Sequence, residues 1–420
     1  MFLSVLKKRN PALIRAALAL HRDNVIPANT WLMDLDAIEH NAEHLVKAKK
    51  QTGLETYLMS KQYNRNPIIN HLAIKKGLGS TVCVDVQCAR AMGRWQLPVG
   101  HVGHLNQIPR GDISYVLGLR PEVWTLYSLE NARYLNEAAS SMGLKQNILL
   151  RVYKPGDVFF SGQEGGFPLD SLHQIMPEIL KLNNLRVVGV TSFPCYLYSY
   201  NPEIPAKPAP NLETILQAAE ILRNQYGLEI TQINAPGNTS AATFPLLKKH
   251  GATHVEPGHG LTGTTPNHVF LEDLPEIPAY CYVSEITHKY EGMAYAHGGG
   301  LFIDSVIPGF TYRAAVGRDD SSIMQTELVW NRINQIIDYH IQLEDASRCE
   351  VGDTVVTCDR TQMQMTRSWI AVVSGISENK PHLAGLFDHA GHMLDEITRE
   401  ALPIQDALAK VANIQQNIEN

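Results

Sequence analysis

The chain has 420 residues, of which 44% are hydrophobic and 19% are charged, and its formal net charge is −6. This length is about three times that of a common domain, so we expect two or three domains, or one large barrel with an appendage. The composition excludes a disordered, collagen-like or coiled-coil protein, and the mild negative charge provides no basic surface for nucleic acid or an anionic membrane.

Six cysteines are spread along the chain without a C-x-x-C pair, which argues against a zinc ribbon or a redox motif. Reduced thiols are the default for such a pattern. No apolar run reaches the roughly 18 residues that a membrane span needs. Arg15, His21 and Arg22 interrupt the N-terminal apolar stretch, which therefore does not suit a signal peptide. We expect a cytoplasmic protein that binds small molecules and has neither nucleic acid nor a membrane as a partner.

Residues 1–30 favour a short helical arm, because their apolar residues have helical spacing and Pro27 ends the pattern. The extended segment TWLMDLD follows. Next comes the amphipathic helix DAIEHNAEHLVKAKKQTG, for which Asp36 is the predicted N-cap and Gly53 the predicted stop. Eight buried-strand candidates then alternate with helical patterns before Pro257: ETYLMSK, STVCVD, VGHVGHL, EVWTLYS, NILLRVY, RVVGVTSF, ITQINA and THVEP.

This alternation predicts an α/β protein whose N-terminal part, residues 31–272, is a (β/α)8 TIM-type barrel. A doubly wound sheet is the alternative, but it would need fewer units, and no G-x-G-x-x-G follows the first strand. Residues 273–420 are expected to form a mostly β domain with a terminal helix, because β-branched or alternating runs follow one another without helices between them. These runs are IPAYCYVSEITHKYEG, GLFIDSVIPGF, RINQIIDYHIQL, GDTVVTCD and SWIAVVSGI.

In such a barrel, functional groups lie at the C-terminal ends of the strands. Lys61 directly follows the first strand, where desolvation would favour the neutral amine that forms a Schiff base; a solvated loop lysine is the alternative interpretation. APGNTSAATF opens a helix after the seventh strand, so Asn238, Thr239 and Ser240 can surround a phosphate. Gly258, in EPGHG after the eighth strand, allows close approach to the same group. A helix cap or a turn is the alternative for each stretch, but together with the lysine they predict a phosphate-bearing carbonyl cofactor.

WLMDLDAIEHNAEHL, followed by a strand and Lys61, resembles the opening of the alanine-racemase-like, fold type III pyridoxal phosphate enzymes. The later segments GNTSAA, EPGHGLTG, YEGMAY, RINQIIDYHI and VGDTVV resemble that family in order and spacing, from roughly Trp31 to Cys358. Within the family, the chain resembles the YhfX-like branch rather than true alanine racemases. The resemblance implies a (β/α)8 barrel and a β domain, pyridoxal 5′-phosphate as the cofactor, an amino-acid substrate and a head-to-tail homodimer.

The resemblance also implies roles for single residues. Lys61 would hold the cofactor as a Schiff base and act as one base, and Tyr295, reaching across a dimer interface, would be the base on the opposite side; a cross-strand aromatic is the alternative for Tyr295. Arg65 would contact the phosphate in place of a tyrosine, and Arg151 would reach the phenolic oxygen of the cofactor or the substrate carboxylate. Phe193 lies near the place where the family stacks a histidine on the ring, and Cys195 is its alternative. The cofactor-binding set is therefore Lys61, Arg65, Arg151, Phe193, Asn238, Thr239, Ser240, Glu256 and Gly258.

Glu256 marks the largest departure from a true alanine racemase, which has an arginine at this place before Pro-Gly. A glutamate keeps the pyridine nitrogen protonated through a charge-assisted hydrogen bond and makes the ring a stronger electron sink. This resembles the decarboxylase branch of the fold. The pair Cys358 and Asp359 resembles that branch too, so Cys358 is a further catalytic candidate.

We expect an enzyme that acts at the Cα of an amino acid or an amino-acid derivative, as a racemase or epimerase. The alternatives are a pyridoxal phosphate-dependent lyase, either a decarboxylase or a metal-assisted enzyme of the D-threonine aldolase or D-serine dehydratase type, and a pyridoxal phosphate-binding protein without turnover. Asp388, His389 and His392 in FDHAGHMLD are the candidate metal ligands, but a solvated loop is the favoured interpretation, and no metal is predicted. The pair His101 and His104 receives still less weight.

Overall fold

The structure is a computed structural model that describes residues 2–199, 206–271, 273–299, 311–331, 339–361 and 367–419. The predicted strand GLFIDSVIPGF and the first part of RINQIIDYHIQL lie outside the described residues. The chain divides into two compact units. Met1–Glu43, Lys61–Leu72 and His259–Asn420 form one, which we call the β unit. His44–Ser60 and Ala73–Gly258 form the other, which we call the barrel unit.

The barrel unit contains a closed sheet of parallel strands, in the order β2-β13-β12-β9-β7-β6-β5-β4-β3. Because only Tyr57 separates β2 from β3, these two are the halves of one strand, which pairs with β13 on one side and with β4 on the other. The strands are β2 (Glu55–Thr56), β3 (Leu58–Met59), β4 (Thr81–Cys83), β5 (Val99–Val102), β6 (Val123–Leu126), β7 (Gln146–Tyr153), β9 (Leu185–Thr191), β12 (Gln232–Asn234) and β13 (His254–Val255), with the short β8 (Phe167–Pro168) added to β7. Each predicted strand of the barrel is present, which confirms the (β/α)8 architecture.

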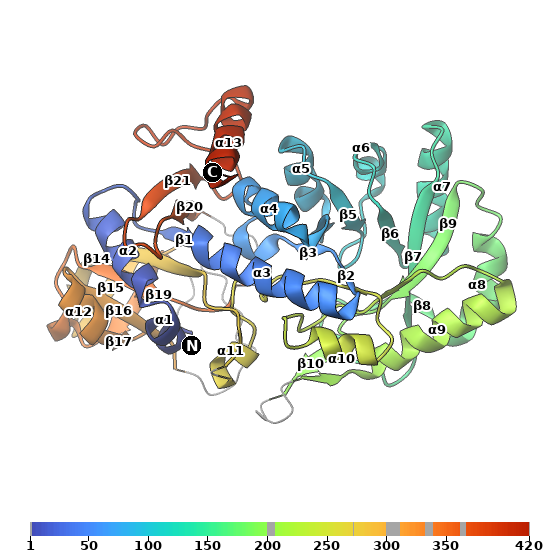
Figure 1. Cartoon of the computed structure of the whole chain (residues 1–420), viewed down its shortest axis with the longest axis horizontal. Helices are drawn as coiled ribbons and strands as arrows, with labels where there is room; N and C mark the ends of the chain where they lie inside the picture. Colours follow the sequence, from blue (N-terminus) through green and yellow to red (C-terminus); the bar gives the residue numbers. More distant parts are fainter. Residues whose placement is uncertain are drawn as a thin grey trace. The chain divides into compact units, whose positions relative to one another are not determined.

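Helices alternate with these strands along the chain and lie on the outside of the sheet in Figure 1. Side-chain caps set where two of them begin: Asp85 accepts a hydrogen bond from the Cys88 amide at the start of α5, and Ser128 accepts one from the Asn131 amide at the start of α7. Gly227, with a left-handed backbone, ends α9. The helices are α5 (Val86–Arg94), α6 (Ile113–Gly118), α7 (Leu129–Ser141), α8 (Leu172–Ile179), α9 (Pro210–Tyr226) and α10 (Phe244–Lys249).

Helix α3 (Leu35–Thr52) begins in the β unit and ends in the barrel unit. The predicted N-cap, Asp36, is wrong: Asp34 caps this helix, because its carboxylate accepts a hydrogen bond from the Ala37 amide. Asp36 instead accepts hydrogen bonds from the amides of Gly375 and Ser377. Either of these two aspartates could cap the helix from its sequence alone. Asp34 does so because the carboxylate of Asp36 is bound by the distant amides of Gly375 and Ser377.

The β unit contains a mixed sheet with the order β17-β16-β19-β14-β1-β20-β21. Two further strands extend this sheet: β15 pairs with β14, and β18 pairs with β15. β1 (Thr30–Asp34), from the predicted extended segment, pairs antiparallel with β14 and parallel with β20, so it belongs to this sheet although it precedes the barrel strands in the sequence. The other strands are β14 (Tyr280–Tyr290), β15 (Met293–His297), β16 (Arg313–Gly317), β17 (Glu327–Val329), β18 (His340–Glu344), β19 (Thr354–Thr357), β20 (Trp369–Ser374) and β21 (His382–Phe387). This confirms the predicted mostly β domain.

The N-terminal arm forms α1 (Leu3–Arg9) and α2 (Pro11–Arg22), which pack on this sheet. Phe2, Leu6 and Leu13 are fully buried in one core with Val283 of β14 and Val356 of β19. Full burial of each large apolar side chain stabilises the unit by roughly 1.5–3 kcal/mol, so the arm is part of the core of the β unit. The remaining helices that begin in this unit are α4 (Pro67–Ala73), α11 (Asn267–Phe270), α12 (Asp320–Gln325) and α13 (Ile404–Glu419).

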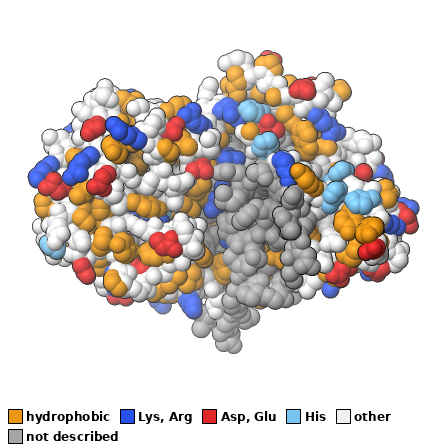
Figure 2. All heavy atoms as spheres, turned by 180° about the vertical axis from the view of Figure 1, so that it is seen from behind, with side chains coloured by type: hydrophobic (Ala, Val, Ile, Leu, Met, Phe, Trp, Pro, Cys, Tyr) orange, Lys and Arg blue, Asp and Glu red, His pale blue; other side chains and the backbone are white. Residues whose placement is uncertain are grey.

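Among the described residues, no helix combines the length and the apolar character that crossing a membrane requires. On the face drawn in Figure 2, acidic and basic side chains are interspersed over the atoms that are not grey. This mixture agrees with the small net charge of the sequence.

Candidate active site

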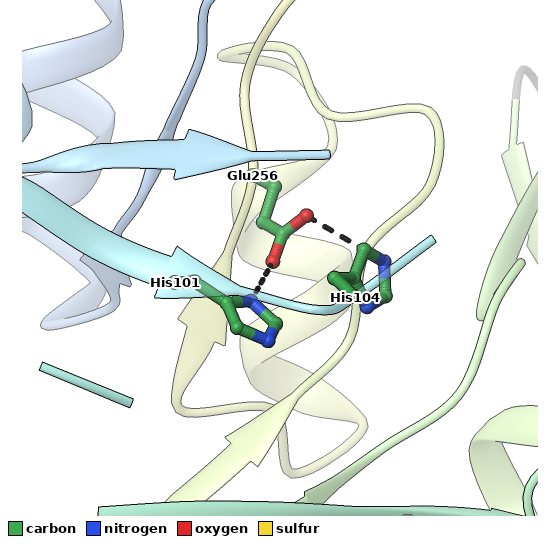
Figure 3. A group of neighbouring side chains, drawn as sticks. All are labelled: His101, His104 and Glu256. Carbon is green, nitrogen blue, oxygen red and sulfur yellow. Dashed lines mark hydrogen bonds and ion pairs between the residues drawn. The ribbon is translucent and has the colours of Figure 1, made fainter. Parts of the chain in front are cut away.

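A buried group of polar side chains lies inside the barrel unit, at the C-terminal ends of several strands. Glu256 follows β13, Asn234 ends β12, and His101 lies on β5. Oε1 of Glu256 accepts hydrogen bonds from Nδ1 of His101 at 2.8 Å and from Nδ2 of Asn234 at 2.7 Å. The other oxygen, Oε2, lies 3.7 Å from Nε2 of His104 (Figure 3). Because functional groups of such barrels lie at these strand ends, this group is the centre of the candidate active site.

Glu256 is ionised despite its burial, with a side chain that is only 1% exposed. Burial by itself raises the pKa of this carboxyl group, but the imidazoles of His104 and His101 and the amide of Asn234 outweigh burial and lower the pKa to about 2. A carboxylate therefore persists here at neutral pH, suited to accept a hydrogen bond from a positively charged N–H group of a ligand.

This carboxylate should make part of the stability of the apo protein sensitive to acid. Its pKa falls from an ordinary 4.5 to about 2 on folding, so its contribution is complete above about pH 5 and is lost as the pH falls toward 2. The difference in unfolding free energy between wild type and Glu256→Gln should shrink by on the order of 2 kcal/mol between about pH 6 and pH 3, measured by urea denaturation. A difference that stays constant over this range would mean that folding leaves the pKa of Glu256 at its ordinary value.

His254 makes a second pH-dependent contribution to the free energy of unfolding. Burial lowers the pKa of this imidazole from 6.5 to about 4, so the folded protein loses stability as the pH falls below about 6.5. Burial, the largest cause of this shift, acts in wild type and in Glu256→Gln alike, but the charge of Glu256 also raises the pKa of His254 and is lost in the variant. Repeating the comparison in a His254→Leu background removes this contribution.

His104 connects the carboxylate to aromatic side chains of the barrel unit. The ring centroid of His104 lies 5.0 Å from that of His101 and 5.9 Å, edge-on, from that of Phe193. Phe193 also contacts Phe160 at 5.6 Å. Cys195, the alternative ring neighbour, is fully buried, and burial raises the pKa of its thiol. The structure thus places His104 beside Phe193. The sequence signal for this histidine was its position in VGHVGH, at the end of a predicted strand.

Arg151 holds the backbone next to His104 and the loop that follows β7. Its fully buried guanidinium donates hydrogen bonds to the carbonyls of His104, Gln163 and Gly165 and to the hydroxyl of Tyr127. The Tyr127 hydroxyl in turn donates to the His104 carbonyl. In the part of the chain that the structure describes, no carboxylate forms an ion pair with Arg151. A buried cation without a counter-ion is costly, and an anionic group of a ligand would offset that cost, in keeping with the role predicted for Arg151.

The loop after β12 fits a phosphate group. Oγ of Ser240 and both amide atoms of Asn238 are buried and have no hydrogen-bond partner among the described residues. Gly237 has φ +123°, and a Cβ there would lie 2.8 Å from the Tyr196 carbonyl oxygen, so the close approach of these two segments requires glycine. Thr239 donates a hydrogen bond to the Gly237 carbonyl at 3.5 Å. Unsatisfied buried donors are costly. Phosphate oxygens would accept hydrogen bonds from Nδ2 of Asn238 and Oγ of Ser240, so these two residues fit the predicted cofactor.

The end of the first barrel strand lies beside the segment that contains Gly258. The Met59 amide, on β3, donates a hydrogen bond to the carbonyl of Pro257. The sequence E-P-G and the strand that leads to Lys61 therefore run next to each other within the barrel unit. Two of the sequence motifs that predicted a cofactor are therefore neighbours in the folded protein.

Lys61 and Arg65 belong to the β unit, and Lys61 starts a short 3-10 helix, Lys61–Tyr63, two residues after β3. Asn64 and Arg65 have left-handed backbones, with φ 52° and 57°. Such strain in non-glycine residues occurs preferentially at functional sites. The nearly buried Arg65 donates a hydrogen bond to the side chain of Asn64, whose amide donates to the His389 carbonyl.

His259, directly after Gly258, is a neutral imidazole for which the sequence predicted no role. Its Nδ1 lies 2.9 Å from the Thr264 hydroxyl. Burial lowers its pKa well below the ordinary value, and the positive charges of Arg360 and Lys61 lower the pKa further. The only sequence feature that pointed to this residue was its position in EPGHG, the motif that follows the eighth barrel strand.

Tyr295 lies on β15 of the β unit and is half-buried. Its ring stacks on that of His288, with centroids 4.5 Å apart and planes 3° apart, and Gln342 donates a hydrogen bond to its hydroxyl at 3.2 Å. The cross-strand ring contact, which was the alternative interpretation, is therefore present. The partial exposure of the ring is also what contact with a second subunit requires.

Cys358 lies in the hydrophobic core of the β unit, fully buried in the same cluster as Cys281. Its Sγ donates a hydrogen bond to the Tyr280 carbonyl at 3.4 Å. Burial raises the pKa of this thiol well above its ordinary value, which disfavours the thiolate that catalysis requires. The catalytic role of Cys358 stays a prediction, which would require the enclosed thiol to become accessible.

Asp388 and His392 contact each other, with 2.8 Å between Oδ2 and Nδ1. Among the described residues, however, the group of three possible metal ligands is His101, His104 and Glu256, whose ligand atoms lie within 4.8 Å of one another. Oε1 of Glu256 already accepts two hydrogen bonds in this group. We therefore interpret His101 and Glu256 as members of a hydrogen-bonded network, beside which His104 lies at 3.7 Å from Oε2.

Two family models match the chain: "Alanine racemase, N-terminal domain" over residues 33–266, and "YhfX-like, C-terminal domain" over residues 281–383. The protein YhfX of Escherichia coli (strain K12) is 38% identical over 396 residues, which are 94% of this chain and 100% of that protein. Among solved structures, D-threo-3-hydroxyaspartate dehydratase from Delftia sp. HT23 is similar with a TM-score of 0.64 and 15% identity, over 87% of this chain and 97% of the other. Alanine racemase of Clostridium difficile 630 gives 0.62 and 14%, over 87% and 99%.

The barrel, the β domain and these matches define an enzyme class, the fold type III proteins, whose cofactor is pyridoxal 5′-phosphate. The chain belongs to the alanine-racemase-like family of this class, in its YhfX-like branch. This confirms the resemblance found in the sequence. The solved structures share too little sequence with the chain to show more than the fold.

Proposed function

We propose that the chain is an enzyme that acts at the Cα of an amino acid or an amino-acid derivative, and that its reaction is a racemisation or epimerisation. The observation that carries the assignment to chemistry at Cα is the buried, ionised Glu256 at the end of the eighth barrel strand, whose Oε2 a pyridine N–H would satisfy. Pyridoxal phosphate, when bound, would condense with the substrate amine and withdraw electrons from its Cα. Asn238 and Ser240 would bind the phosphate, and Arg151 would bind an anionic oxygen of the cofactor or substrate.

Racemisation needs a proton acceptor and a proton donor on opposite sides of Cα. We assign Lys61, directly beyond the first barrel strand, to one side and to attachment of the cofactor. Tyr295 is assigned to the other side, and its half-exposed ring on β15 supports a contribution across a head-to-tail homodimer. In this proposal the active protein is a cytoplasmic homodimer.

A lyase is the second candidate, and Glu256 favours it. A carboxylate next to the ring nitrogen keeps that nitrogen protonated, so negative charge left at Cα is better stabilised than it is beside an arginine. With this stabilisation, the bond from Cα to the carboxylate or to Cβ can break, as in a decarboxylase or an aldolase, or a leaving group can depart from Cβ, as in a dehydratase.

Incubating the holoenzyme with a panel of D- and L-amino acids and their derivatives in D2O tests the proposal. We expect deuterium at the Cα of at least one compound, together with its enantiomer or epimer, followed by mass spectrometry and chiral chromatography. Release of carbon dioxide, ammonia or an aldehyde would select the lyase instead. Cofactor bound at Lys61 without exchange or product would contradict an enzymatic role and indicate a binding protein. Free pyridoxal phosphate at the same concentration is the control.

A further inference from the structure

We propose that His101 is a positioning residue, which holds the Glu256 carboxylate ionised and leaves Oε2 as the atom that accepts a hydrogen bond from the cofactor ring. The inference rests on the proposed function, because it takes Glu256 as the partner of the ring nitrogen. His101 touches neither cofactor nor substrate in this proposal and acts through Glu256.

The contacts of His101 hold its ring in one orientation. Nδ1 lies 2.8 Å from Oε1 of Glu256, and because a carboxylate oxygen only accepts, Nδ1 carries a proton. Nε2 lies 2.5 Å from the hydroxyl of Thr125 on β6. The Thr125 hydroxyl can donate to Nε2 or accept from it, so this hydrogen bond holds the ring whichever of the two atoms carries the proton. Thr125 thus orients His101, and His101 orients Glu256, along one chain of hydrogen bonds inside the barrel (Figure 3 shows the last link).

The two oxygens of Glu256 have different surroundings. Oε1 accepts from both His101 and Asn234, which holds the carboxylate from two strands, β5 and β12. Oε2 accepts no hydrogen bond from the described residues, and Nε2 of His104, at 3.7 Å, lies beyond hydrogen-bonding distance. Oε2 is therefore the oxygen that a ring N–H would use.

Other ionisable side chains face this pair from the surrounding strands: His104 after β5, Tyr57 between β2 and β3, His254 on β13 and Cys195 after β9. Of these four, His104 is the one within ion-pair distance of Glu256. His101 and Asn234 are the groups that donate hydrogen bonds to the carboxylate. Removing His101 therefore removes half of these direct donors.

His101→Leu tests the proposal, and His101→Asn is its matched control, because asparagine keeps an N–H donor close to the position of Nδ1. His254→Leu removes a half-buried imidazole of the same barrel that makes no hydrogen bond to Glu256, and so controls for lost packing. Infrared difference spectra of the apo proteins, each against the same background carrying Glu256→Gln, report whether the carboxyl group is ionised. Titration with pyridoxal phosphate at several pH values gives the Kd of each variant relative to wild type.

We expect an ionised Glu256 in wild type, His101→Asn and His254→Leu, and a partly protonated one in His101→Leu at mildly acidic pH. The ratio of the His101→Leu Kd to the wild-type Kd should rise by up to about tenfold per pH unit on the acidic side, whereas the ratio for both controls should not change with pH. Using the ratio cancels the titration of the cofactor itself. Should His101→Leu fail to fold, His101→Gln replaces it, since its longer amide reaches toward Thr125 instead of Oε1.

A purely structural role for His101 would change the Kd equally at every pH and leave Glu256 ionised, and this result would overturn the proposal. Stoichiometric Zn²⁺ binding by the apo protein that His104→Ala abolishes would overturn it too, because the cluster would then be a metal site. Failure of the proposed function looks different: wild type would not attach pyridoxal phosphate at Lys61. The infrared measurement on the apo protein still decides the role of His101 in that case.

Discussion

Lys61→Ala should abolish covalent attachment of pyridoxal phosphate and lower turnover by at least about 10²- to 10⁴-fold, the range lost when a positioned proton-transfer group is removed. The reason is that one amine has two roles, formation of the Schiff base and proton transfer at Cα. Borohydride reduction followed by peptide mass spectrometry checks the attachment, because wild type should carry one phosphopyridoxyl group, on the peptide with Lys61. Deuterium exchange at Cα checks the proton transfer.

Lys61→Arg is the matched control for charge. It keeps a cation at the end of the first barrel strand but cannot form the Schiff base, so it should be as inactive as Lys61→Ala while binding the phosphate better. Lys249→Ala, at the exposed end of α10, should behave like wild type. A reduced cofactor found on another lysine, or turnover that survives in Lys61→Ala, would refute the assignment of Lys61.

Mixed dimers should show that Lys61 and Tyr295 of different subunits share one active site. Lys61→Ala and Tyr295→Phe should each be inactive as homodimers. When equal amounts are unfolded and refolded together, half of the dimers are mixed, and each of these has one site with an intact lysine and an intact tyrosine. The mixture should therefore recover about a quarter of the wild-type rate, because a twofold-symmetric dimer has two equivalent sites.

Two other outcomes of this mixing experiment are informative. If Tyr295 acts within its own subunit, the mixture stays inactive, since no chain carries both residues intact. If Tyr295 is only a packing aromatic against His288, the Tyr295→Phe homodimer is active by itself, because phenylalanine keeps the ring contact of 4.5 Å and loses only the hydroxyl. The first outcome would contradict the sharing of one site by two subunits, and the second would remove Tyr295 from the proposed mechanism.

Local sequence patterns predicted the barrel and much of its site. The apolar runs alternate with helical patterns over a stretch that the structure shows as one closed parallel sheet. Asn238 and Ser240 were identified from a strand-to-loop motif, and their buried, unsatisfied atoms fit the phosphate expected there. Such features depend on neighbours in the sequence, which is why they are visible without a structure.

Burial and distant partners decide other features, which the local sequence does not show. Cys358 next to Asp359 has the sequence of a reactive pair, yet the arm residue Phe2 and the strand residue Val283 belong to the same core and show that the thiol is enclosed. Asp36 reads as a helix cap but is engaged by amides more than three hundred positions away. No window of the sequence contains these partners.

The barrel, the β domain, the family and the lysine at the end of the first strand could all be inferred from the amino-acid sequence, because each depends on periodicity or on motifs that lie along the chain. How Glu256 stays ionised could be seen only in the folded protein. His101, the residue that holds it, is 155 positions away in the chain and meets it only where the strands of the closed sheet bring their ends together. Electrostatic contacts depend on distance in space and on exclusion of water, and both are properties of the folded barrel.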